Sequence, residues 1–270
     1  MRSKIVSNSE ITQQHILDIR KMFTEEAITI NKSSFLNKLL EDVEKNYSKE
    51  NNSIPIIFNA IHINRIHSAL MELNGINNKH NYLKDLLKGN LDFHENKESH
   101  AKNILFELEV AVKLKPLNCN IYLQEPDIVI ETKETKIAIA CKKIVSEKNL
   151  KKLISKASKQ IKKQNLDFAI IAINIDNLLP NNQILKAKNS EEASDILHNS
   201  IKIFIEKHHR HLNRKLGVYN VLGIYITASI ITDLTDEIPR FNNHSQTVLF
   251  TINNPRKEEK QVLDLFQTLI

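Results

Sequence analysis

The chain has 270 residues, of which 41% are hydrophobic and 26% are charged, proportions that exclude an intrinsically disordered protein. The formal net charge is +6, which favours acidic partners such as nucleic acids. No apolar run approaches the roughly 18 residues that a membrane helix needs, and the first ten residues lack the apolar region of a signal peptide. We therefore expect a cytoplasmic protein that has no contact with a membrane.

The first third of the sequence predicts helices, because apolar residues recur there at helical spacing. The recurring positions are Ile16, Ile19 and Phe23, then Phe35, Leu39 and Val43, then Ile63, Ile66, Leu70 and Leu73. Ser34 is a suitable N-cap for the second helix, and Asn74-Gly75 is a typical end for the third. We interpret residues 1–98 as a helical N-terminal region that either caps the rest of the chain or binds a partner protein or a second copy.

From residue 99 onward, segments with strand character are interleaved with helical segments. We expect strands over 121–130, 137–142, 168–175, 218–226 and 247–252, and helices over 102–114, 148–164, 191–215 and 256–269. Such alternation is typical of a layered α/β fold with a mixed sheet. Residues 99–270 are therefore predicted to form one α/β domain.

The helix predicted over 102–114 contains two candidate carboxylates. Glu107 falls between the apolar positions of the helix, so its side chain is expected to point inward. Glu109 stands four residues before Lys113, the spacing of a solvent-facing ion pair. Helix periodicity favours Glu107 as the functional residue and leaves Glu109 as the alternative.

The two strands that follow contain an aspartate and two lysines. Asp127 begins an apolar run although aspartate is depleted in strands. In the next strand Ala140 and Lys142 face one side, whereas Cys141 and Lys143 face the other. The alanine side leaves room for a metal ion and a phosphate, so Lys142 is favoured over Lys143 as the partner of Asp127. Carboxylates that hold a hard cation beside a lysine suit phosphodiester hydrolysis.

The helix predicted over 148–164 is rich in lysine. Residues 142–163 contain nine lysines and a single acidic residue, Glu147. Gln160 lies two turns after Leu153, on nearly the same buried side, and therefore needs a hydrogen-bond partner. The lysines that we expect to contact a nucleic-acid backbone are Lys143, Lys152, Lys156, Lys159 and Lys163. The alternative is that these lysines form only a solvated helix face.

The order of these residues resembles the PD-(D/E)xK nuclease superfamily, which has the restriction-endonuclease-like fold. The similarity rests on a helix with Glu107, a strand with Asp127, a strand with Lys142 and a helix with Gln160. It implies a layered α/β/α core that hydrolyses DNA with Mg²⁺ (or Mn²⁺), as in restriction, repair and defence nucleases. It also implies that Glu107, Asp127 and the main-chain carbonyl of Cys141 hold the metal, with Lys142 and Gln160 beside them.

One position departs from the pattern of the family. Members often have Glu-Cys-Lys where this chain has Ala140-Cys141-Lys142, and alanine cannot bind a metal. Glu125 lies two residues before Asp127, on the same face, and is a candidate to compensate. Three functions therefore stay open: an active nuclease, a catalytically degenerate nuclease fold that binds DNA or assists assembly, and a protein-interaction subunit.

Overall fold

The computed structural model describes residues 3–6, 8–48, 53–76, 78–93, 95, 97–117, 119–164, 166–179 and 184–270. The N-terminal region is helical, as predicted: α1 (Ser9–Glu25), α2 (Phe35–Asn46) and α3 (Ile54–Leu70) match the three predicted helices, and α4 (Lys79–Leu86) is a fourth. The later helices are α5 (His100–Leu114), α6 (Leu150–Gln164), α7 (Ser190–Asn213) and α8 (Lys257–Gln267). The expected cap of α2 is present, because the backbone N–H of Asn37 donates to Ser34 Oγ at 3.2 Å.

All the strands of the described chain belong to one mixed sheet. They are β1 (Ser3–Val6), β2 (Asn120–Tyr122), β3 (Ile128–Glu131), β4 (Lys136–Lys143), β5 (Phe168–Asn174), β6 (Leu185–Ala187), β7 (Val221–Leu234) and β8 (Phe241–Thr251). Their order is β1-β8-β7-β5-β4-β3-β2, and β6 pairs with β7. Strands β2, β3 and β4 are antiparallel, whereas β4, β5 and β7 are parallel.

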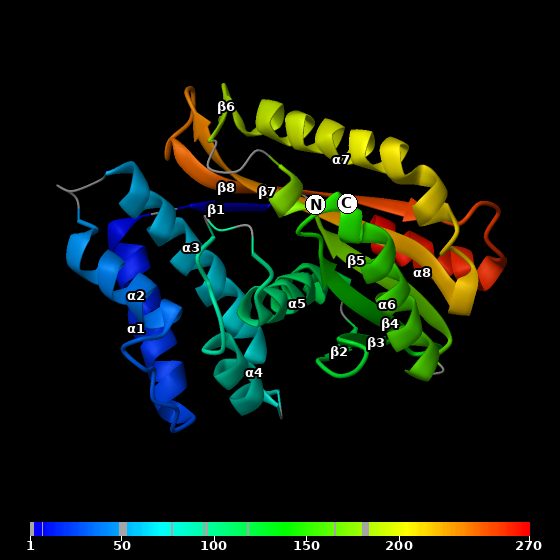
Figure 1. The fold of residues 1–270 in the computed structure, drawn as a ribbon, viewed down its shortest axis with the longest axis horizontal. Helices are drawn as coiled ribbons and strands as arrows, with labels where there is room; N and C mark the ends of the chain where they lie inside the picture. The colour runs from blue at the N-terminus through cyan, green and yellow to red at the C-terminus, as the bar shows by residue number, and fades with distance from the viewer. Residues whose placement is uncertain are drawn as a thin grey trace.

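Helices cover both faces of the sheet, which confirms the predicted layered α/β architecture. On one face, Ala138 and Ala140 of β4 pack with apolar residues of α6 and α7. On the other face, Ile137, Ile139 and Cys141 pack with α5, and α8 lies further along the same face. Figure 1 shows α7 on one side of β7 and β8, with α3 and α5 on the other side. The strand alternation that we inferred from the sequence of β4 is therefore correct.

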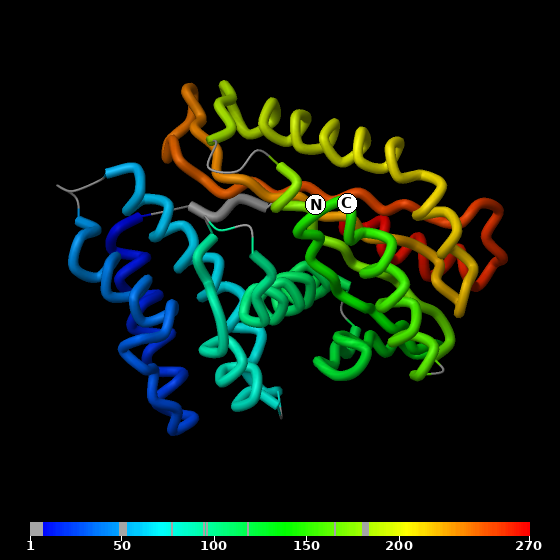
Figure 2. The backbone as a smooth tube through the Cα atoms, in the orientation of Figure 1, coloured from blue at the N-terminus to red at the C-terminus, as the bar shows by residue number. Residues whose placement is uncertain are grey.

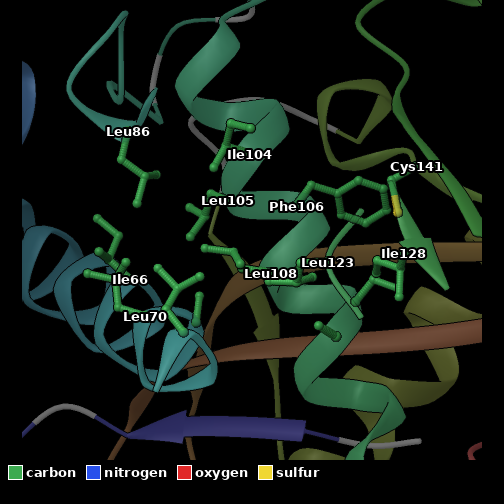
Figure 3. Close-up of a cluster of buried hydrophobic side chains, with 14 of the residues drawn as sticks. Ile66, Leu70, Leu86, Ile104, Leu105, Phe106, Leu108, Leu123, Ile128 and Cys141 are labelled. Atoms are coloured by element: carbon green, nitrogen blue, oxygen red, sulfur yellow. The ribbon is translucent and has the colours of Figure 1, made fainter. Parts of the chain in front are cut away.

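The N-terminal helices share their apolar core with the sheet. Ile66 and Leu70 of α3 and Leu86 of α4 meet Leu105 and Leu108 of α5 (Figure 3). The chain trace in Figure 2 shows this helical group beside α5, at one end of the molecule. Burial of such side chains stabilises the fold by about 1.5–3 kcal/mol each. Helix α5 is thus held between the N-terminal helices and the sheet, and the rotation of α5 about its axis is fixed.

The strands differ from the predicted elements in three ways. The strand expected over 121–130 is two strands, because residues 123–127 break away between β2 and β3. Strands β7 and β8 extend well beyond 218–226 and 247–252, and β1 and β6 were not predicted at all.

Within the described residues, no helix is both long and apolar enough to cross a lipid bilayer.

Candidate active site at the ends of strands β3 and β4

Asp127 and Lys142 meet where the β3–β4 hairpin opens. Asp127 directly precedes β3, and its Oδ2 accepts a hydrogen bond of 2.6 Å from the backbone N–H of Cys141. Lys142 Nζ lies 3.1 Å from the same oxygen and donates to the carbonyl oxygen of Cys141 at 2.7 Å. The ammonium group therefore bridges a carboxylate and a main-chain carbonyl. Asp127 therefore contacts Lys142 and not Lys143, as predicted.

Helix α5 brings Glu107 to the same place. Burial raises the pKa of Glu107 to about 8, and the nearby Asp127 carboxylate adds to this rise while Lys142 opposes it. Burial also raises the pKa of Asp127, although Lys142 and the Cys141 N–H favour its ionised form. Raised pKa values of two carboxyl groups beside one lysine make this cluster a candidate functional site, because burial outweighs the effect of the lysine on both groups.

Glu109 does not belong to this group. Its Oε1 lies 2.9 Å from Nη2 of Arg65 in α3, and its side chain is 21% exposed. The expectation that Glu109 faces solvent with Lys113 is wrong, because α3 covers this side of α5. The structure thus decides between the two glutamates: Glu107 faces Asp127, and Glu109 faces Arg65.

Helix α4 contributes two residues that sequence reasoning missed. The first is Asp85, whose carboxylate raises the pKa of Glu107. The exposed residue Glu125, which lies outside α4, raises the pKa of Glu107 as well. Tyr82 lies close enough for Glu107 and Asp127 to raise its pKa in addition to the effect of burial. In the sequence, the buried residues Leu83 and Leu86 alternate with Tyr82 and Asp85, which predicts an amphipathic helix. Only the packing of α4 on α5 shows that Tyr82 and Asp85 face the site.

Gln160 reaches the site from α6. Its Nε2 lies 3.4 Å from the carbonyl oxygen of Pro126, the residue before Asp127. Its Oε1 is buried and accepts no hydrogen bond within the described residues. A buried acceptor without a partner costs about 1–3 kcal/mol, so this oxygen is available to a ligand or a water molecule. Gln160 therefore lies beside the Asp127–Lys142 pair, and Glu107 is near enough to interact with both, an arrangement that agrees with the family resemblance.

The oxygen donors of the site suit a hard cation such as Mg²⁺. They are the carboxylates of Glu107 and Asp127 and the carbonyl of Cys141, and a bound cation would compete with the Lys142 ammonium for two of these. Ala140 adds no carboxylate because its side chain is a methyl group, and this side chain is fully buried against α6. In the described part of the chain, no three His, Cys, Asp or Glu side chains form a group that could hold a metal ion. Two carboxylates and one carbonyl are thus the donors that we expect to hold a cation here.

The thiol of Cys141 has no part in this donor set. It is 5% exposed and packs toward Phe106 and Ile128 on the α5 face of the sheet (Figure 3). Burial raises its pKa well above the usual value, so the reactive thiolate is disfavoured. Cys141 serves the site only through its main-chain N–H and carbonyl groups.

Four of the five predicted nucleic-acid contacts lie on the outer face of α6. Lys152, Lys156, Lys159 and Lys163 are exposed, opposite a buried face, and none makes an ion pair within the described residues. Lys143 does not join them. Its side chain is 10% exposed, and its Nζ donates to Asn174 Oδ1 at 2.8 Å, because Lys143 lies on the isoleucine face of β4 beneath α5.

Comparisons of the chain with protein-family models, with curated proteins and with solved structures find no match. What the site can do therefore follows from its own chemistry. A lysine beside two carboxylates can neutralise charge that develops on an oxyanion, and the carboxylates can hold a divalent cation. An exposed row of unpaired lysines on the adjacent helix supplies attraction for a polyanion.

Proposed function

We propose that the chain is a metal-dependent nuclease of the PD-(D/E)xK type that hydrolyses phosphodiester bonds in DNA. The observation that carries this proposal is the contact of Lys142 with Asp127 and the Cys141 carbonyl at the end of the β3–β4 hairpin. Glu107 and Gln160 approach from helices on the two faces of the sheet, in the order that the family resemblance implies.

Each residue has a distinct role in this proposal. Glu107, Asp127 and the Cys141 carbonyl would hold Mg²⁺, which supplies charge to the scissile phosphate and makes a bound water more acidic. Lys142 places its ammonium against the phosphate oxygens, where negative charge grows in the transition state. Gln160 presents its free Oε1 to orient the attacking water by accepting a hydrogen bond. The exposed lysines of α6 align the DNA backbone with these groups.

One observation favours a second function. Ala140 occupies the position of the expected second acid and is fully buried, so the metal is held by fewer carboxylates than in an intact motif. A domain that binds DNA without cutting it, as an assembly component, would keep the lysines of α6 and dispense with tight metal binding. The first function predicts DNA cleavage and the second does not, whereas both predict DNA binding that weakens as the salt concentration rises.

The deciding experiment incubates the protein with plasmid DNA and with single-stranded DNA, in Mg²⁺ and in Mn²⁺. We expect metal-dependent cleavage that Asp127→Ala and Asp127→Asn both abolish, while DNA binding in the absence of metal is retained. Binding without cleavage under every condition would support the DNA-binding component. Neither binding nor cleavage would leave only a protein-interaction role and would overturn the proposal.

A further inference from the structure

A second polar site lies under helices α3 and α5, separate from the site at Asp127. It is a cavity of about 220 Å³ between these helices and strands β5, β7 and β8. Its polar lining includes Arg65, Glu109, Lys113, Asn174, Asn243 and Ser245. The volume is below the range of drug-sized pockets, about 300–1,000 Å³, but equals roughly seven water molecules at about 30 Å³ each. The cavity can therefore hold a small molecule but not a nucleic-acid strand.

The sheet face that forms the floor of this cavity is polar, although helices cover it. Strand pairing places Thr227 opposite Thr247 and Ser229 opposite Ser245. Asn243 continues the row on β8. A sheet face packed against helices is usually apolar, because buried polar groups cost free energy unless they are hydrogen-bonded. A row of small polar side chains in this place is suited to contact a polar ligand.

The charged groups around the cavity do not balance. Arg65, Lys113 and Lys143 are cationic and Glu109 and Asp176 are anionic, so the group has a net charge of +1 when all are ionised. Arg65 is paired with Glu109 at 2.9 Å, and Lys143 lies 4.0 Å from Asp176. Lys113 forms no close ion pair within the described residues, although Glu109 and Asp176 lie near enough to oppose the effect of burial on its pKa.

The contacts of Lys113 are weak. Its Nζ lies 3.4 Å from Thr247 Oγ1, and it makes no ion pair in the part of the chain that the structure describes. Burial lowers the pKa of Lys113, and the carboxylates of Glu109 and Asp176 oppose this shift only in part. Lys113 is part-buried beside the cavity, so an anion bound there would stabilise its charged ammonium group.

Asn243 supplies an independent sign of a missing partner. The residue lines the cavity, is 4% exposed, and its Oδ1 accepts no hydrogen bond within the described residues. Most buried polar side-chain atoms in proteins have a partner, so an unpaired acceptor beside a cavity can be satisfied by a hydrogen-bond donor within that cavity. A ligand that satisfies both residues has an oxyanion for Lys113 and a hydrogen-bond donor for Asn243.

We propose that this cavity binds a small oxyanion, phosphate- or carboxylate-bearing, through Lys113 and Asn243. A monoanion would bring the net charge of the charged group to zero. A phosphate group that retains one proton, or a hydroxyl group next to a carboxylate, would also donate to Asn243 Oδ1. The site is distinct from the proposed nuclease centre, and its occupancy does not depend on whether the chain cleaves DNA.

Thermal unfolding in defined anions tests the proposal. The wild-type protein is melted in sodium phosphate, in sodium glycolate and in sodium chloride at equal ionic strength and pH. We expect phosphate or glycolate to raise the Tm above that in chloride, in a saturable manner. A rise with phosphate alone identifies a phosphate-bearing ligand, and a rise with glycolate alone identifies a carboxylate. No rise with either anion would overturn the proposal.

Three variants locate the effect. Lys113→Met keeps the aliphatic length but removes the charge, and should weaken anion binding at least tenfold. Asn243→Ala removes one hydrogen-bond acceptor and should weaken anion binding less than Lys113→Met does. The combined change of Lys152, Lys156 and Lys159 to glutamate removes the exposed lysines of α6 and should leave the anion effect unchanged. If the α6 variant loses the effect while Lys113→Met keeps it, the anion binds to the surface and the cavity site is refuted. Isothermal titration of the wild type with phosphate and glycolate gives the affinity directly, should either cavity variant fail to fold.

Discussion

Arg65 and Glu109 form an ion pair that joins helix α3 to helix α5, with Nη2 of Arg65 2.9 Å from Oε1 of Glu109. Successive residues of a helix are rotated by about 100°, so Glu107 and Glu109 point in nearly opposite directions, about 200° apart. The pairing of Glu109 with Arg65 therefore orients Glu107 toward Asp127. A contact with the N-terminal region thus fixes the rotation of the helix that supplies a site carboxylate.

The first prediction follows from this ion pair. Arg65→Met should lower the free energy of unfolding by about 3–5 kcal/mol, because Glu109 is left as a part-buried charge without its closest partner. The double variant Arg65→Met with Glu109→Gln should recover part of that loss, because Asp176, 3.8 Å from Arg65 in the wild type, still lacks this partner. Urea denaturation of both variants measures the difference. Equal stabilities of the single and double variants would mean that the pair does not hold α3 against α5.

The second prediction concerns the pH dependence of stability. The pKa of Glu107 is raised to about 8 in the folded protein, above its ordinary value of 4.5. The stabilising effect of the protonated carboxyl is complete below about pH 4.5 and is lost as the pH rises through 8. Glu107→Gln should therefore gain stability relative to the wild type between pH 5 and pH 9, by an amount on the order of 1–4 kcal/mol.

Chemical denaturation at pH 5, 7 and 9 measures this gain. The exposed residue Glu206 on α7 provides a matched control, because Glu206→Gln makes the same chemical change away from the site. A constant difference between Glu107→Gln and the wild type at all three pH values would contradict the shifted pKa. Saturating Mg²⁺ should reduce the pH dependence of the wild type, since a bound cation favours the ionised carboxyl.

Local sequence patterns distinguished two of the four site residues from their neighbours, and the family resemblance supplied the grouping of all four. The two-residue period of β4 separated Lys142 from Lys143, and the helical period of α5 singled out Glu107, because both periods depend only on neighbouring residues. The same strand period placed Lys143 on the isoleucine face, where α5 covers it. The prediction that Lys143 contacts nucleic acid together with the exposed lysines of α6 was therefore wrong, because it did not take this covered face into account.

Contacts between distant segments could not be inferred in this way. Arg65 and Glu109 are 44 positions apart, and neither has a local pattern that identifies the other. Residues 242–246 read Asn-Asn-His-Ser-Gln, which has low strand propensity, yet they lie within β8 because β7 on one side and β1 on the other supply backbone partners. The polar cavity beneath α5 therefore had no signal in the sequence.

The third prediction tests the exposed lysines of α6. Changing Lys152, Lys156 and Lys159 to glutamate should weaken DNA binding by at least tenfold at low salt and reduce the slope of log K against log salt, because fewer counterions are released. The control changes Lys32, Lys257 and Lys260, which are also exposed, to glutamate and alters the net charge equally. Fluorescence anisotropy across a salt titration measures both variants. If both lose affinity alike, net charge and not the face of α6 governs binding.

The last prediction concerns the missing acid. Asp127 directly precedes β3, and the pairing of Ile128 with Ile139 places it opposite Ala140 on β4. Ala140→Glu would restore the acid that the family resemblance implies at this position. Because Ala140 is fully buried against α6, the larger, charged side chain should lower stability by about 2–4 kcal/mol in the absence of metal. Mg²⁺ or Mn²⁺ should recover much of this loss, since a cation between the new carboxylate and Asp127 relieves their repulsion.

Ala138 provides the matched control for this experiment. It is also fully buried on the same face of β4, but it lies two residues further from the open end of the hairpin, opposite Val129. Ala138→Glu should therefore be destabilised to a similar extent and gain no more from Mg²⁺ than the wild type does. Thermal-shift titrations of both variants separate the two effects. If Ala140→Glu responds to Mg²⁺ and Mn²⁺ no more than Ala138→Glu does, then Asp127 and its neighbours do not form a metal site, and a role in DNA binding without cleavage becomes the better account of this fold.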